Sequence, residues 1–129
     1  LDLGVCSYFL IMAGADQATY KGIVNENFVY IDLLKRVKDM SIAGMAPMFG
    51  TYTEGEIDFL VRNIDNFENY GVEVKAGKSA GKTAQQLLRD NKVEAVYFLK
   101  GDTYGGLAER MITVPIYLVN RVRFDYRKE

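Results

Sequence analysis

The stretch that decides the fold is residues 71–99, GVEVKAGKSAGKTAQQLLRDNKVEAVYFL. Apolar and charged residues alternate at its start, a pattern that predicts a strand. Its end, Val93–Leu99, is a β-branched and aromatic run of strand length. Between the two, Thr83 and Gln86 repeat a capping pattern and predict a short helix. Strand, helix and strand in this order are typical of the unit from which parallel sheets are built.

Upstream, the sequence predicts two more strands, over residues 3–12 and 41–49, because both runs are apolar and end at glycine. An amphipathic helix that begins at Asn25 or Asn27 separates them. A second helix is predicted over residues 53–70, because a capping box is followed by apolar residues at i, i+3, i+4 and i+7.

Downstream, residues 105–111 are a candidate short helix and residues 112–119 a fifth strand. Elements that alternate in this way predict an α/β fold, a three-layer, doubly wound and mostly parallel sheet of about five strands. A length of 129 residues predicts one domain over residues 1–129.

Composition excludes several classes of function. Sixteen Lys and Arg against seventeen Asp and Glu give a net charge of −1, so we expect no nucleic-acid partner. The chain has no histidine and a single cysteine, Cys6, which excludes Ser-His, Cys-His and zinc-histidine mechanisms and an internal disulfide. We therefore expect no metal site and no cofactor. No apolar run approaches the roughly 20 residues of a membrane span, so we expect no membrane partner and a cytoplasmic protein.

Two loops at predicted strand ends favour binding of an anion. FGTYTEG (49–55) and AGKSAGKT (76–83) each precede a predicted helix, and ligands of doubly wound folds bind beside the carboxyl ends of the strands. Glycines permit close backbone approach, and amides at a helix N-terminus attract negative charge. The candidate ligand-binding residues are Gly50, Thr51, Thr53, Gly77, Lys78, Ser79, Gly81, Lys82 and Thr83.

Three functions are compatible with these loops. The leading hypothesis is a non-catalytic or regulatory domain that binds a small anionic metabolite, phosphorylated or carboxylated, as a homo-oligomer. The second is an enzyme, lyase-type or other, that acts on a phosphorylated small molecule with Asp16 or Asp102 as base. The third is a structural or interaction protein that forms a homo-oligomer, in which the loops are only turns.

The order of elements and four segments resemble the methylglyoxal-synthase-like domain family. GTYTEG (50–55) resembles its Thr-rich phosphate loop, and KSAGK (78–82) its Ser-Gly phosphate loop. QQLLRDNKVEAVYFLKGD (85–102) is similar to the helix and strand that follow, and VPIYLVN (114–120) to its final strand. The resemblance spans about residues 31–121 and implies a phosphate-binding fold.

The enzymes of that family use histidines, which this chain lacks, so the resemblance implies binding of a small anionic effector rather than methylglyoxal synthesis. A second resemblance is to the iron-molybdenum-cofactor-binding family related to nitrogenase accessory proteins. It is carried by PMFG (47–50) and GKTAQQLLRDNKVEAV (81–96). Without histidine, no obvious ligand for a cluster follows from it.

Overall fold

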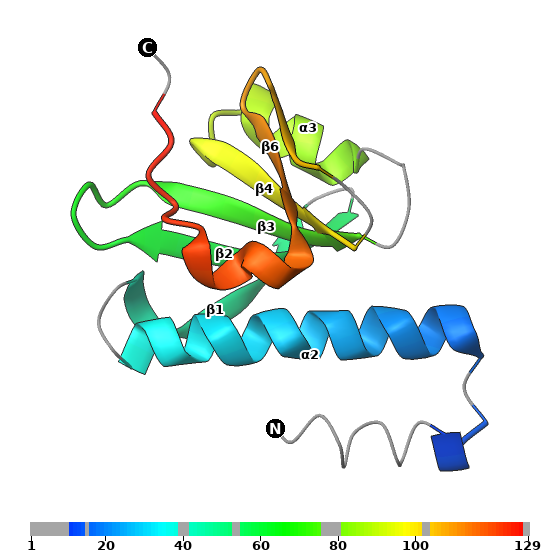
Figure 1. The fold of residues 1–129 in the computed structure, drawn as a ribbon. Helices are drawn as coiled ribbons and strands as arrows, with labels where there is room; N and C mark the ends of the chain where they lie inside the picture. Colours follow the sequence, from blue (N-terminus) through cyan, green and yellow to red (C-terminus); the bar gives the residue numbers. More distant parts are fainter. Residues whose placement is uncertain are drawn as a thin grey trace.

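The structure is a computed structural model. It describes residues 11–14, 16–38, 42–52, 55–75, 81–101 and 104–127, with the backbone alone at 42–52 and 55. One long helix, α2, runs along a sheet, and a short helix, α3, packs near its middle (Figure 1). The elements in chain order are α2 (Gln17–Lys38), β1 (Ile42–Tyr52), β2 (Gly55–Asn63), β3 (Asn69–Lys75), α3 (Lys82–Arg89), β4 (Ala95–Lys100), β5 (Gly106–Ala108), β6 (Met111–Pro115) and the 3₁₀ helix η1 (Ile116–Arg121).

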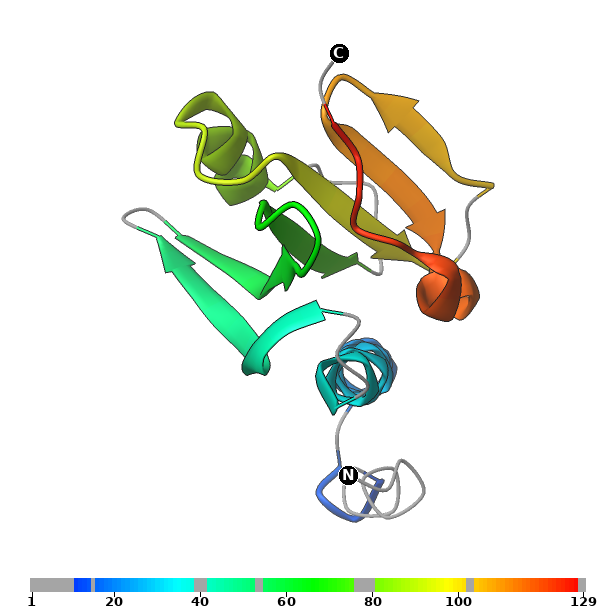
Figure 2. The same cartoon turned by 90° about the vertical axis from the view of Figure 1, so that its left-hand side faces the viewer.

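The fold is α/β, as predicted, but the sheet is mixed, and the expectation of a mostly parallel sheet is wrong. The six strands that the structure describes have the order β1-β2-β3-β4-β6-β5. β1, β2 and β3 pair antiparallel, β3, β4 and β6 pair parallel, and β5 returns antiparallel on β6. Two hairpins therefore form the opposite ends of the sheet (Figure 2). Among the described elements, only β3, α3 and β4 form the strand-helix-strand unit expected throughout.

The main cause of this error is β2, which was predicted as part of a helix over residues 53–70. Residues 57–62, IDFLVR, fit both the helical period and the two-residue period of a strand, because Ile57, Phe59 and Val61 also alternate with the residues between them. β-Branched and aromatic side chains favour the strand, and pairing on both sides of β2 outweighs the capping signal.

The first helix begins earlier than predicted. Asp16 is its N-cap, because the Thr19 amide donates a 2.8 Å hydrogen bond to Asp16 Oδ1. α2 then continues through Gly22 and both asparagines, with Val29 and Leu33 fully buried. The strand predicted over residues 3–12 lies mostly outside the described residues, and its last two residues, Ile11 and Met12, are helical.

Helix α3 and the last part of the chain differ in detail from the prediction. α3 begins at Lys82 after Gly81, which makes no side-chain cap, so Thr83 lies inside the helix. The helix predicted over 105–111 is wrong, because these residues form β5 and a turn. The predicted fifth strand is confirmed up to Pro115 (β6), beyond which the chain turns into η1.

The two faces of the sheet bury different helices. α2 covers one face together with η1 and the C-terminal tail, and α3 covers the other. In β3 and β4 the side chains alternate between these faces, as a regular pleat requires. The α2 side buries Val29, Leu33, Phe59, Val61, Tyr70, Val72, Ala95, Tyr97, Leu99, Val119, Val122 and Phe124. The α3 side buries Ile57, Ala84, Leu87, Leu88, Val93, Val96 and Phe98.

A β-bulge interrupts the alternation in β2. Along β1 the pairing advances two residues, from Met48 to Gly50, while along β2 it moves three, from Leu60 to Ile57. Ile57 therefore belongs to the α3 side although Phe59, two residues on, belongs to the α2 side. The bulge directly adjoins Asp58.

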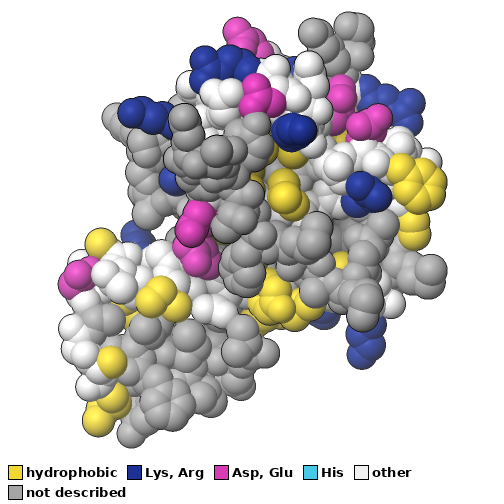
Figure 3. Space-filling model, turned by 180° about the vertical axis from the view of Figure 1, so that it is seen from behind, with side chains coloured by type: hydrophobic (Ala, Val, Ile, Leu, Met, Phe, Trp, Pro, Cys, Tyr) yellow, Lys and Arg dark blue, Asp and Glu magenta, His cyan; other side chains and the backbone are white. Residues whose placement is uncertain are grey.

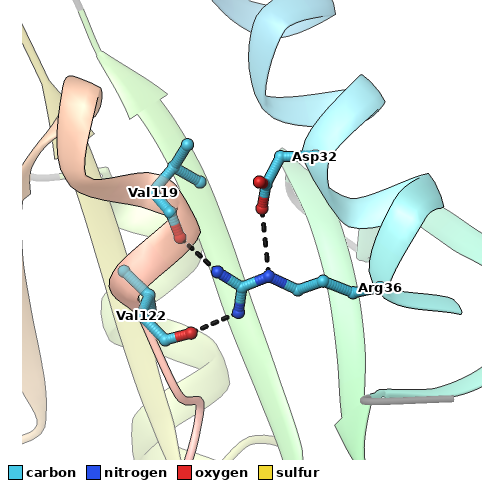
Figure 4. Close-up of polar contacts among 4 residues, drawn as sticks. All are labelled: Asp32, Arg36, Val119 and Val122. Atoms are coloured by element: carbon cyan, nitrogen blue, oxygen red, sulfur yellow. Dashed lines mark hydrogen bonds and ion pairs between the residues drawn. The ribbon is translucent and has the colours of Figure 1, made fainter. Parts of the chain in front are cut away.

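The C-terminal tail is tied to α2 by Arg36. Its guanidinium donates hydrogen bonds to the carbonyls of Val119 and Val122, and Nε lies 3.0 Å from Asp32 Oδ2 (Figure 4). The same guanidinium lies 5.4 Å from the ring centroid of the buried Phe124. Residues more than eighty positions apart thus share one contact.

Among the residues that the structure describes, no helix has both the length and the apolar character needed to cross a membrane.

Candidate functional site

Charged side chains from two neighbouring strands meet beside the bulge. Asp58 comes from β2, and Glu73 and Lys75 come from β3. In a regular strand Glu73 and Lys75 share a face, and here that face is the α3 side, so Glu73 is only 6% exposed. A buried carboxylate on a strand requires a partner or a function.

Side-chain hydrogen bonds join β2 to β3 where the regular ladder ends. The last paired residues are Phe59 and Val72. Beyond them the Val74 amide donates a 2.6 Å hydrogen bond to Asp58 Oδ2, and the Asp58 amide donates a long one, 3.4 Å, to Glu73 Oε2. The two carboxylates are therefore held by backbone groups of the opposite strand, which fixes their positions.

Lys75 is the cation of this group. Its Nζ lies 2.8 Å from Glu73 Oε1. The pKa of Lys75 is raised, first by this hydrogen bond and further by the charges of Glu73, Asp58 and Glu26, so the ammonium is charged at neutral pH.

The carboxyl groups disfavour one another's ionisation. Burial raises the pKa of Asp58 to about 6, and the charges of Glu73 and Glu26 act in the same direction, while the Val74 hydrogen bond and Lys75 oppose the shift. The pKa of Glu26, on α2, is raised by partial burial of its carboxyl and by the charge of Glu73. Three carboxyl groups thus lie near a single ammonium. Viewed from behind, acidic side chains gather where α2 meets the sheet (Figure 3).

The start of α3 adjoins Glu73. A Cβ built on Gly81 would lie 3.4 Å from Glu73 Oε1, so the chain passes close to the carboxylate at this point. The first amides of α3 have no partner within the helix and favour negative charge. Lys82 at this end is exposed.

The predicted anion-binding residues that the structure describes fall into two groups. Gly81, Lys82 and Thr83 lie at the start of α3, beside Glu73. Gly50 and Thr51 are in β1, paired with Ile57 and Glu56, so the first loop belongs to a hairpin and does not precede a helix. The remaining candidates, Thr53, Gly77, Lys78 and Ser79, lie outside the described residues.

The ends of β1 and β3, which precede the two loops in the chain, nevertheless lie at the same edge of the sheet. β1 and β3 both pair antiparallel with β2, so they run in the same direction and their carboxyl ends coincide. Asp58, Glu73 and Lys75 also lie near this edge.

Of the two predicted bases, the structure describes only Asp16, which is not part of this charged group. Asp16 caps α2, and hydrogen bonds from Thr19 lower its pKa, which makes it a weaker base at neutral pH. Asp102 lies outside the described residues.

Sequence reasoning missed Glu26, Asp58, Glu73 and Lys75. Asp58 lies within the helix predicted over residues 53–70, and Glu73 and Lys75 were considered only as the charged residues that alternate with apolar ones in a predicted strand. The signal that could have found them is the pattern Glu-x-Lys at the end of a strand, directly before the glycine-rich loop.

A comparison with models of known protein families finds no match for this chain, and a comparison with curated protein sequences finds none either. The resemblance to the methylglyoxal-synthase-like family stays a prediction.

Proposed function

We propose that the site formed by Asp58, Glu73 and Lys75 binds a divalent cation and hydrolyses a phosphate ester. The observation that carries the proposal is the convergence of two carboxylates from adjacent strands beside a lysine ammonium, each carboxylate fixed by a backbone amide.

The charge balance of the site favours a cation. Asp58, Glu73 and Glu26 would carry three negative charges when ionised, against one positive charge on Lys75. Partial burial makes this excess costly, and a bound cation would offset it. Carboxylate oxygens are ligands that Mg²⁺ and Mn²⁺ prefer.

The number of carboxylates favours a Mg²⁺ ion whose coordination shell is completed in part by the substrate. Within the described residues, no three acidic, cysteine or histidine side chains are arranged to hold a metal ion by themselves. Mg²⁺ is commonly bound by one or two carboxylates, with waters and substrate phosphates completing its shell. Asp58 and Glu73 fit that number, and Glu26 is near enough to act electrostatically on both.

The bound cation would lower the pKa of a water ligand and neutralise charge on the phosphate. Lys75 is placed to attract a phosphate oxygen or the attacking water, since its ammonium already contacts Glu73. The first amides of α3, with Lys82, would attract the same phosphate. The anion-binding role predicted for Gly81, Lys82 and Thr83 thereby becomes part of the site.

A second candidate is the binding of an anionic metabolite without reaction. It is favoured by the start of α3, which can attract a phosphate independently of any cation. The two functions differ in whether Asp58 and Glu73 are needed.

The test is cation binding and hydrolysis measured on the same set of variants. Mn²⁺ binding is followed by calorimetry, and hydrolysis with bis(p-nitrophenyl) phosphate and with a DNA duplex as two diesters. Asp58→Asn and Glu73→Gln should abolish cation binding and turnover, and Lys75→Met should abolish turnover alone. Asp65→Asn, an exposed acid in the β2–β3 turn, should change neither.

Absence of Mn²⁺ binding to the wild-type protein would refute the proposal. If cation binds but no ester is turned over, and phosphate protects the protein equally in Asp58→Asn, the non-catalytic function is the better description.

A further inference from the structure

A pocket lies on the α3 side of the sheet, away from α2. Its lining residues belong to β4 and to the β5–β6 hairpin. These strands are neighbours at one end of the sheet (Figure 2). Its volume is about 290 Å³. The residues that line it are Phe98, Lys100, Gly106, Leu107, Ala108, Met111 and Thr113.

Strand register places four of these residues on one surface. Phe98 pairs with Thr113 in the parallel β4–β6 ladder, and Ala108 pairs with Met111 in the antiparallel β5–β6 ladder. Side chains of directly paired residues share a face, so the four lie together. The hairpin residues 104–109 are all exposed, which leaves the pocket open at the edge of the sheet.

The lining combines an apolar floor with one positive charge. Phe98 is only 3% exposed, and Lys100 Nζ lies 5.9 Å from the centroid of its ring, within the range of a cation–π contact. Among the described residues, the ion pairs of the protein involve Arg36 and Lys75 but not Lys100. The ammonium of Lys100 is therefore available to a negative group that enters the pocket.

We infer that this pocket binds a planar aromatic compound that carries one anionic group. The aromatic part would pack on the edge or face of Phe98 among Ala108 and Met111, and the anionic group would contact Lys100. A cavity of about 150 Å³ accommodates benzene. The pocket is nearly twice that size, which suits two fused rings. Apolar pockets with one or two fixed polar groups are the usual form of small-molecule sites.

The position of Lys100 adds to this inference. Lys100 pairs with Lys75 in the β3–β4 ladder, and neighbouring strands lie about 4.8 Å apart. Lys75 is held in an ion pair with Glu73, so at this end of the two strands it is the Lys100 ammonium that can meet an anionic group. The inference does not depend on the proposed hydrolysis, because neither a cation nor a reaction enters it.

The test is binding of 2-naphthoate in the presence of EDTA, measured by calorimetry and by saturation-transfer NMR. Its neutral analogue, 2-naphthalenemethanol, is the matched ligand control. We expect Lys100→Met to weaken naphthoate binding at least tenfold and to leave the neutral analogue nearly unchanged. Ala108→Phe, which adds bulk on the exposed hairpin, should weaken both ligands.

Two variants serve as controls. Lys92→Met removes an exposed lysine before the opposite end of β4 and should have no effect. Asp58→Asn should also leave naphthoate binding unchanged, which separates this pocket from the hydrolytic site. The inference is wrong if wild-type protein does not bind naphthoate, or if Lys100→Met and Ala108→Phe bind it as tightly as wild type. Blockage of the pocket by self-association, detected by sedimentation, would give the same negative result and would equally overturn it.

Discussion

The amide of Val74 donates a 2.6 Å hydrogen bond to the carboxylate of Asp58, where an ordinary antiparallel pair would use a carbonyl. The bulge in β2 permits this exchange, because it changes the direction of Asp58 relative to its neighbours. A side chain thereby acts in place of the backbone between β2 and β3. Burial disfavours the ionisation of this same carboxyl group and raises the pKa of Asp58 more clearly than that of Glu26.

Asp58→Asn should stabilise the metal-free protein at pH 8. An amide of nearly the same shape can still accept the Val74 hydrogen bond, while the unfavourable charge near Glu73 and Glu26 disappears. We expect a gain of about 1 kcal/mol, or about 4 °C in Tm, measured by thermal unfolding in EDTA. A lower Tm would show that the charged form is the one the fold requires.

The pH dependence of stability provides an independent check. The pKa of Asp58 is raised from 3.8 to about 6 in the folded protein, so the native state binds more protons than the unfolded state between these values. Its contribution to stability is therefore present below about pH 4 and is lost as the pH rises towards and through 6. In EDTA, the difference between wild type and Asp58→Asn should widen over this interval. A difference that stays constant from pH 4 to 7 would contradict the assignment.

Asp16→Ala should affect the helix and not the chemistry. The carboxylate accepts the Thr19 amide at the start of α2, so its removal leaves that amide without its cap. We expect a Tm lower by a few degrees and unchanged Mn²⁺ binding. Asp16→Ser, which restores a capping oxygen, should recover the stability. Loss of turnover in the serine variant would instead support Asp16 as a base.

Gly71→Ala should destabilise the sheet because its Cβ has no room. The added atom would lie 2.5 Å from Ile57 Cδ1 and 3.2 Å from Val96 Cγ2. We expect a loss of about 1–3 kcal/mol in chemical denaturation. Ile57→Val removes the Cδ1 atom, so the double variant should be less unstable than the sum of the two single changes. Simple additivity would show that Ile57 is not the obstacle.

Arg36→Met should loosen the C-terminal tail. It removes the donors to the Val119 and Val122 carbonyls and the contact with Phe124. We expect a loss of roughly 2 kcal/mol, together with faster proteolysis near residues 119–127. Arg36→Lys should restore little of it, since an ammonium lacks the planar fork that reaches two carbonyls. Arg123→Met, at an exposed position, is the control.

The sequence predicted the second half of the fold better than the first. β3, α3 and β4 are local units whose patterns agree with their burial, and they were predicted within a few residues. β2 was predicted as a helix because residues 57–62 satisfy both periods, and only its pairing with β1 and β3 decides between them. Pairing depends on residues distant in sequence, so local patterns cannot supply it.

The charged site was missed for a related reason. Glu73 is assigned to solvent if its strand is considered alone, and it is buried because α3 folds back over that side. Asp58 joins it only because β2 is a strand. The anion-binding loop before α3 could be predicted, since glycine and lysine before a helix indicate it directly.

The bond between Arg36 and the tail also bears on the order in which the protein can fold during synthesis. The α2 side of the core contains Val29 and Leu33 from the first third of the chain and Val119, Val122 and Phe124 from its last tenth. A nascent chain can form the β1–β2 hairpin early, but this layer has to wait until residue 124 has left the ribosome. Such distant closure slows folding and lengthens the time for which α2 presents an uncovered apolar surface, so chaperone dependence should persist until residue 124 has emerged from the ribosome.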